Sequence, residues 1–231
     1  MLSEYDKETM LLAIDTSTAT IGLAIYDGSS VIGETAWTAG NHHTVTLAPA
    51  VLRLCESVDL NFEHIKGFGI ALGPGSFTSL RVGLSFVKGM ALGLNVPIIG
   101  VPTLDILAAA QPRSTLPLCA VLQAGRNRIA TQYYRYEKKK WVSQGELNVF
   151  SLEEFAQSIQ NPTLVSGELT AEFRTFLRRN NRDIRMATPA MCLRRTGFLA
   201  EIAWQGLVKG RINPPSELAP IYLHTKGSLA V

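Results

Sequence analysis

Three short strand-like segments follow one another near the start of the chain, and their order restricts the fold more than any other feature. The segments LLAIDTST, TIGLAIYDG and SVIGETAW, between residues 11 and 37, are rich in Ile, Val, Leu and Thr, and Asp-Gly and Gly turns separate them. This pattern predicts an antiparallel three-stranded meander. Helical and strand-like segments alternate after it, so the sequence predicts a mixed α/β sheet with helices packed on it.

The first of these helical segments lies between the meander and the strand-like KGFGIALG. Leu47, Val51 and Leu54 recur in it at helical spacing. Pro49 is compatible with this prediction if the helix begins near Thr46, because proline is tolerated in the first turn.

The segment from Phe77 to Asn95 is predicted to be a helix with more apolar surface than one sheet can cover. It has one seam at four- and three-residue steps and a second face of apolar or small residues. Gly83, Gly89 and Gly93 each cost roughly 1 kcal/mol relative to Ala, which favours close approach of another helix. We therefore expect another chain to cover one seam; the alternative is a central helix buried within one subunit. The residues expected at this interface, here and on the preceding helix, are Leu47, Val51, Leu54, Leu80, Leu84, Val87, Met90, Ala91 and Leu94.

The loop GPGS that opens this helix has little resemblance to a nucleotide-binding loop. It lacks the Lys and the spacing of a Walker loop and the three glycines of the dinucleotide pattern. Pro74 also removes one backbone donor, whereas Ser76 or Thr78 can cap the helix without any ligand.

A Pro- and Ser-containing segment, QPRSTLP, predicts a boundary near residue 112, so we expect an N-terminal α/β subdomain over 1–112 and a C-terminal one over 113–231. In the second part, LPLCAVLQA and RIATQYYRYE are predicted to pair as strands. Ser151 and Glu154 have the spacing of a helix-capping box, and a further helix is expected from Thr196 to Val208. The sequence shows no convincing internal repeat.

Composition narrows the class of protein. The 231 residues are 46% hydrophobic, which is sufficient for a large core, and no apolar run of 18 residues predicts a membrane span. The N-terminus does not resemble a secretory signal, Met10 is an alternative start, and the three scattered cysteines suit a reducing compartment, so we expect a cytoplasmic protein with buried thiols. The net charge of +3 is too small for an autonomous nucleic-acid binder. Much of it is clustered, at Lys138, Lys139, Lys140, Arg178, Arg179, Arg182, Arg185, Arg194 and Arg195.

Four motifs together resemble the bacterial TsaB (YeaZ-like) family of tRNA threonylcarbamoyladenosine biosynthesis: LAIDTST, GPGSFTSLRVG, VPIIGVPTLDILA and PIYL. The resemblance implies an actin-like ATPase (ribonuclease H-like) fold with two α/β subdomains and mixed sheets. It also implies a noncatalytic scaffold that supports a TsaD-type catalytic subunit, which modifies the adenosine next to the anticodon. Further implied partners are a TsaE-type ATPase, a second copy bound through the N-terminal helices, and tRNA indirectly.

The residues argue against catalysis by this chain alone. Its catalytic relatives bind metal through an HxxxH motif, whereas His42 and His43 are adjacent and diverge by about 100° on a helix, so we expect no metal and place both at the surface or a cap. Asp15 occupies the place of the acidic residue in the phosphate hairpin of actin-like kinases, but Ser17 replaces the usual Gly. Asp15 and Ser17 remain candidates for a residual nucleotide contact, and ATP or ADP at the partner interface is compatible with the resemblance. The alternatives are an autonomous actin-like kinase or ATPase and a metallopeptidase.

Overall fold

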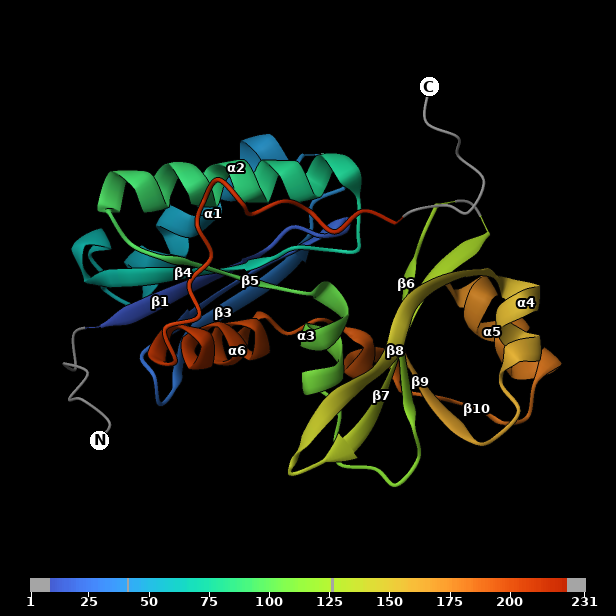
Figure 1. Ribbon diagram of the computed structural model, residues 1–231. Helices are drawn as coiled ribbons and strands as arrows, with labels where there is room; N and C mark the ends of the chain where they lie inside the picture. The colour runs from blue at the N-terminus through green and yellow to red at the C-terminus, as the bar shows by residue number, and fades with distance from the viewer. Residues whose placement is uncertain (1–8, 41, 126, 224–231) are drawn as a thin grey trace. The chain divides into compact units, whose positions relative to one another are not determined.

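The computed structural model describes residues 9–40, 42–125 and 127–223, which form two compact α/β units (Figure 1). The first unit contains the residues up to Ile106 together with Arg195–Ile221, and the second contains Leu107–Arg194 and the residues from Tyr222. This division differs from the one expected at residue 112. The chain returns to the first unit near its end because a largely apolar helix there covers one face of the first sheet.

The first unit is built on one five-stranded sheet. Its strands are β1 (Met10–Asp15), β2 (Thr20–Tyr26), β3 (Val31–Thr38), β4 (Ile65–Ala71) and β5 (Ile98–Val101). In the order β3-β2-β1-β4-β5, the first three strands are antiparallel, whereas β4 is parallel to β1 and to β5. The predicted meander and the mixed sheet are both confirmed.

Helices cover both faces of this sheet. Helices α1 (His43–Ser57) and α2 (Phe77–Leu94) lie on one face and α6 (Thr196–Val208) lies on the other (Figure 1). Because successive side chains of a strand point to opposite faces, Leu12 and Ile14 of β1 pack in the core with α1 and α2, while Leu11 and Ala13 pack with α6. A strand covered on both faces needs a continuous apolar run, and MLLAI provides one.

The second unit repeats the strand topology of the first. Its strands are β6 (Leu118–Gln123), β7 (Arg128–Glu137), β8 (Lys140–Ser151), β9 (Thr163–Glu168) and β10 (Ile184–Met186), in the order β10-β9-β6-β7-β8. The strands β6, β7 and β8 form an antiparallel meander, and β9 is parallel to β6 and to β10. The fold therefore contains two similar sheets, although the sequence shows no repeat.

Helices α4 (Leu152–Ser158) and α5 (Ala171–Asn180) contribute to the core of the second unit. The expected capping box is confirmed: the Glu154 backbone N–H donates to Ser151 Oγ at 3.1 Å, and the Ser151 N–H donates to the Glu154 carboxylate at 2.7 Å. The remaining elements are α3 (Thr103–Ala109) and the short 3₁₀ turns η1 (Phe62–His64) and η2 (Pro189–Cys192).

Two local expectations have different outcomes. Helix α1 begins at His43, not near Thr46, so Pro49 lies inside the helix, where its exposed position tolerates the missing backbone donor. Cys55, Cys119 and Cys192 are all buried, as expected, and burial raises the pKa of the Cys119 thiol. Within the described ranges, no helix is long and apolar enough to cross a membrane.

A carboxylate from the edge strand β3 holds the start of α6. The Gly197 N–H donates to Glu34 Oε1 at 2.9 Å, and Arg195 donates to Glu34 Oε2 from Nη2 at 2.5 Å and from Nε at 3.2 Å. Arg195 occupies the N-cap position, and its side chain makes no capping hydrogen bond. Glu34 therefore supplies the anionic acceptor that the first turn of the helix needs.

We predict that Glu34→Gln lowers the free energy of unfolding by about 1–2 kcal/mol, as measured by urea denaturation. Most of this loss comes from the helix start, because the Arg195 side chain is 58% exposed and an exposed ion pair contributes little. Glu201→Gln, at an exposed position on the same helix, is the control and should change stability by less than about 0.5 kcal/mol. Equal effects of the two substitutions would contradict the capping role.

Candidate functional site

The start of α2 is built against the hairpin between β1 and β2. Ser76 is the N-cap of α2, and its backbone N–H donates to the Ser17 carbonyl at 2.7 Å. The Thr16 hydroxyl donates to the carbonyl of Ser79, in the first turn, at 2.8 Å. Ser79 in turn donates from its hydroxyl to Ser76 Oγ at 2.9 Å. The hairpin and the helix start therefore form one hydrogen-bonded assembly.

Two glycines permit this close approach. A Cβ on Gly75 would lie 2.1 Å from the Ser17 carbonyl oxygen, and a Cβ on Gly83 would lie 2.1 Å from Thr16 Oγ1. Neither distance leaves room for a side chain, so the glycine-led loop positions the hairpin against α2.

The acidic residue of the hairpin is buried and engaged locally. Asp15 is 1% exposed, and its Oδ1 accepts hydrogen bonds from the Ser17 N–H at 2.8 Å and from the Ser17 hydroxyl at 2.5 Å. The two residues proposed for a residual nucleotide contact are therefore brought together. In this arrangement both Ser17 donors point to Asp15.

The two adjacent histidines have different environments. His43 is 4% exposed and its Nε2 lies 2.8 Å from the Thr18 carbonyl oxygen, so it joins α1 to the same hairpin. It is buried as the first residue of α1, whereas we expected a position at the surface or a cap. His42 is exposed at the N-cap position of α1. Among the residues in 9–40, 42–125 and 127–223, no group of three or more His, Cys, Asp or Glu is arranged to hold a metal ion.

The apolar seam of α1 and α2 faces the sheet. Seven of the nine expected interface residues are buried and not on the surface, because α1 and α2 cover the sheet with this seam. They are 0–7% exposed and belong to the core or its margin: Leu47, Val51, Leu54, Leu80, Leu84, Val87 and Ala91. Met90 and Leu94 are half-buried.

The side of the same helices that is turned away from the sheet is open and carries both apolar and polar residues. On α2, Leu92 is 85% exposed, and Phe77, in the first turn, is 51% exposed; on α1, Val45 is 67% and Leu52 is 48% exposed. A shallow hollow at the N-terminal end of α2 is lined by Thr44, Phe77, Thr78, Arg81, Val82 and Ser85. The described part of the first unit thus leaves four large apolar side chains of α1 and α2 exposed.

A row of apolar residues and glycines runs along α2 beside this open side. Val82, Phe86, Gly89 and Gly93 follow at steps of four, three and four residues, which places them on one face, and we call them the outer strip. Val82 and Phe86 are half-buried and pack at the margin of the core, whereas Gly89 and Gly93 are exposed. A Cβ on Gly89 or Gly93 would meet nothing within 4 Å, so no packing inside the described chain explains these two glycines. The sequence signal for the strip was the second apolar face of α2.

A family model described as TsaD: tRNA N6-adenosine threonylcarbamoyltransferase matches residues 37–194. The chain is 33% identical to the tRNA threonylcarbamoyladenosine biosynthesis protein TsaB of Bacillus subtilis over 55% of its own length, and it spans about half (56%) of that relative. It is 25% identical to the TsaB protein of Haemophilus influenzae over 94% of each chain.

Solved structures show the fold. YeaZ from Pseudomonas aeruginosa matches with a TM-score of 0.78 and 21% identity over 93% of this chain and 100% of that one. The ROK hexokinase of Thermus thermophilus matches with a TM-score of 0.50 and 10% identity, over 87% of this chain and 100% of the hexokinase chain. The implied actin-like ATPase fold, with two five-stranded mixed sheets, is thereby confirmed.

We predict that alanine has opposite effects at two glycines of α2, as measured by urea denaturation. Gly83→Ala should lower the free energy of unfolding by about 1 kcal/mol or more, because the new methyl group displaces Thr16 and breaks its bond to Ser79. Gly89→Ala should raise it by up to about 1 kcal/mol, because the methyl group enters open space and improves helix propensity. A stabilising Gly83→Ala would contradict the proposed packing.

Proposed function

This chain belongs to the family described as TsaD: tRNA N6-adenosine threonylcarbamoyltransferase, with TsaB proteins of tRNA threonylcarbamoyladenosine biosynthesis among its relatives, and from this premise we propose that it is a noncatalytic scaffold subunit of that pathway. Its role is to bind and support a TsaD-type catalytic subunit, which modifies the adenosine next to the anticodon. The binding surface is the open side of α1 and α2.

The observation that carries this proposal is the outer strip. Glycine in a helix interior costs roughly 1 kcal/mol relative to alanine, and the positions of Gly89 and Gly93 bring no packing benefit inside the described chain. A helix of another chain can approach closely at such positions. The exposed Leu92 and Leu52 would then contribute apolar area to the same interface.

The hairpin supports a noncatalytic role. In actin-like kinases the corresponding turn presents backbone donors to phosphates, and a helix N-terminus is the favoured place for an anion. In this chain the Ser76 N–H at the start of α2 donates to the Ser17 carbonyl, and the Ser17 N–H donates to Asp15. Phosphate binding here would require these bonds to be exchanged for new ones.

Further assembly follows from the same surface. We extend the proposal to a homodimer formed through α1 and α2 and to a TsaE-type ATPase as an additional partner, with tRNA reached indirectly. A second copy and the catalytic subunit would compete for the outer strip. ATP or ADP would belong to the partner interface, with Asp15 and Ser17 as the residues of this chain to test, and the chain would need no metal of its own.

The fold itself favours one rival function. An autonomous kinase or ATPase would use the same architecture as the ROK hexokinase, and Asp15 would be its acidic residue at the hairpin. Turnover of ATP by the purified chain distinguishes this rival from a scaffold.

We predict that Gly89→Arg abolishes co-purification of the TsaD-type subunit, because the new side chain occupies the closest point of approach and brings a charge into an apolar interface. The folded chain should be as stable as the original or more stable by up to about 1 kcal/mol, since the position is open and arginine has a higher helix propensity than glycine. The control is Gln205→Arg, which adds the same positive charge at an exposed position of α6 and should leave capture of the subunit unchanged. Retained capture by the Gly89 variant would refute the interface.

We predict that the purified chain hydrolyses no ATP above background in a phosphate-release assay, because its hairpin donors are engaged within the chain. Asp15→Asn provides the control for a contaminating enzyme. Turnover that is present in the original chain and lost in this variant would establish the rival function.

A further inference from the structure

The structure separates the seven arginines between residues 174 and 195 into two groups. Arg174 donates to Cys192 Sγ at 3.3 Å and to the Ala187 carbonyl at 2.5 Å, Arg194 forms a buried ion pair with Glu168, and Arg195 binds Glu34. These three side chains have structural partners that account for their presence.

The second group has no such partners. Arg178 and Arg179 lie in the last turn of α5, Arg182 lies in the turn that follows, and Arg185 lies on the edge strand β10. All four are exposed, and none forms an ion pair with another described residue. We call these four residues the basic edge.

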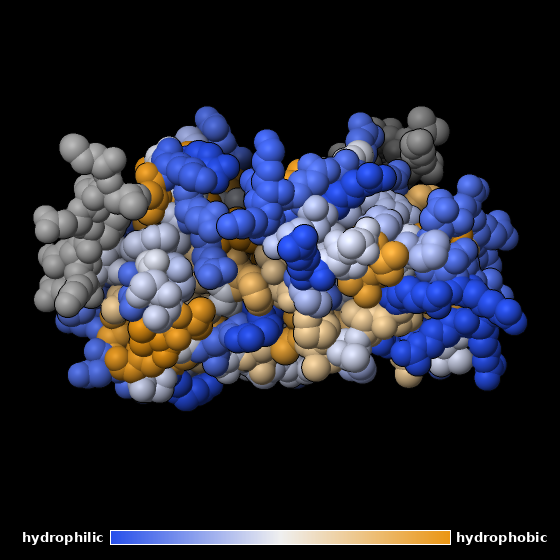
Figure 2. Space-filling view, turned by 90° about the horizontal axis from the view of Figure 1, so that it is seen from below, coloured by the Kyte–Doolittle hydropathy of each residue, from blue (hydrophilic) through white to orange (hydrophobic). Residues whose placement is uncertain are grey.

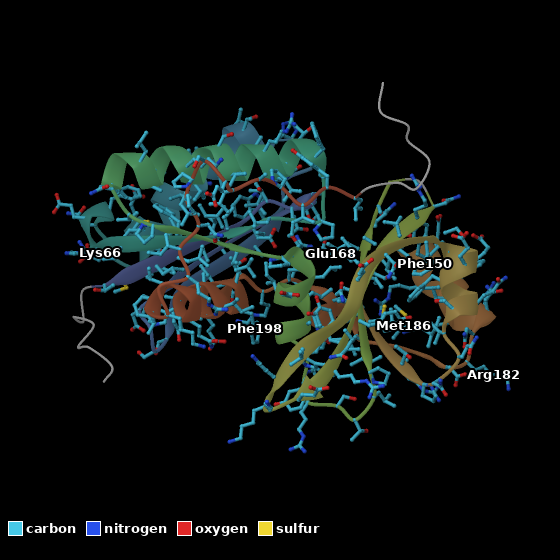
Figure 3. All side chains as sticks on the ribbon, in the orientation of Figure 1. Lys66, Phe150, Glu168, Arg182, Met186 and Phe198 are labelled. Carbon is cyan, nitrogen blue, oxygen red and sulfur yellow. The ribbon has the colours of Figure 1, made fainter. Side chains whose placement is uncertain are left out.

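The basic edge concentrates positive charge over a short length of chain. Between Arg178 and Arg185 there is one acidic residue, Asp183, against four arginines. Arg182 and Arg185 are three residues apart, so their Cα atoms are separated by no more than about 11 Å. Figure 2 shows strongly hydrophilic residues over this unit on the face turned to the viewer. Figure 3 shows Arg182 projecting outward, whereas Met186 lies toward α5.

Helix stability explains only part of this arrangement. Arg178 and Arg179 lie in the last turn of α5, where a positive charge is favoured by the helix dipole. Arg182 and Arg185 lie outside the helix and gain nothing from it. An aromatic side chain also lies beside the arginines, because a shallow hollow on α5 is lined by Ala171, Glu172, Thr175, Phe176, Arg179 and Asn180.

This chemistry suits an RNA backbone better than an acidic protein surface. Guanidinium groups bind phosphate oxygens through paired N–H donors, and a row of them on exposed positions tracks a phosphate chain. An aromatic ring next to arginine is a common feature of RNA contacts, because unstacked bases can pack on it.

We propose that the basic edge contacts the phosphate backbone of the tRNA substrate directly, in place of the indirect contact given under the proposed function. This chain then helps to seat the RNA as well as the catalytic subunit. The proposal rests on the function proposed above. It assigns the RNA contact to the second unit, whereas the protein interface lies on α1 and α2 of the first unit.

The test compares two triple variants of the full chain with the same change in net charge. Arg178→Glu/Arg179→Glu/Arg182→Glu reverses the basic edge, and Lys138→Glu/Lys139→Glu/Lys140→Glu reverses the exposed lysines at the turn between β7 and β8. Arg185 is left unchanged because it lies in β10. Binding of an unmodified tRNA transcript is measured by fluorescence anisotropy from about 50 to 200 mM salt, and circular dichroism verifies folding.

The arginine variant should bind tRNA at least about tenfold more weakly at low salt. The magnitude of the slope of log K against log salt should fall by about 2–3, as expected for three lost phosphate contacts. The lysine variant should retain most of the affinity and slope. If both variants lose binding equally, or neither does, or the original chain does not bind tRNA, the proposal is overturned.

Capture of the TsaD-type subunit is measured on the same variants and separates this proposal from the scaffold function. Both triple variants should capture the subunit as the original chain does. Loss of capture by the arginine variant with unchanged tRNA binding would mean that the basic edge binds an acidic protein surface, and would also overturn the proposal. If the original chain itself fails to capture the subunit, the scaffold function is refuted. The tRNA contact is then still tested independently by the anisotropy measurement.

Discussion

Hydrogen bonds between the first hairpin and the start of α2 determine the arrangement of the first unit. Residues of the hairpin bind the N-terminus of α2. The Ser17 carbonyl accepts a hydrogen bond from the Ser76 N–H, and the Thr16 hydroxyl donates to the Ser79 carbonyl. Gly75 and Gly83 are required for this contact, because a side chain at either position would overlap the hairpin. These two glycines therefore allow the helix start and the hairpin to hold each other in place within the unit.

This docking also determines which side of α2 remains open. With the helix held at its start and Leu84 and Val87 buried against the sheet, Gly89 and Gly93 of the outer strip are left exposed, whereas its Val82 and Phe86 are half-buried at the margin of the core. Its open glycines are then the feature that sets this helix apart from an ordinary covering helix. The proposed scaffold role follows from that exposed side together with the family membership, and not from the buried seam.

The second unit has a sheet of the same topology but a different surface. Its meander and parallel strands repeat the order of the first sheet, but α5 ends in exposed arginines that have no partner in the described chain. Arg194 and Arg195, which follow closely in sequence, are held by Glu168 and Glu34. In the sequence these arginines form one cluster. In the structure, ion pairs separate Arg194 and Arg195 from the exposed arginines of α5.

The sequence by itself determined the local elements and the family. The meander, the α2 segment, the Ser151 capping box and the buried cysteines were predictable because periodicity, turn residues and caps act over a few neighbouring positions. Tertiary structure decided what depends on distant contacts: that α6 returns to the first sheet, that His43 binds Thr18, and that seven expected interface residues face the core. A helix with two apolar faces does not reveal which face covers its own sheet, because that choice is made by the hairpin docked at its start.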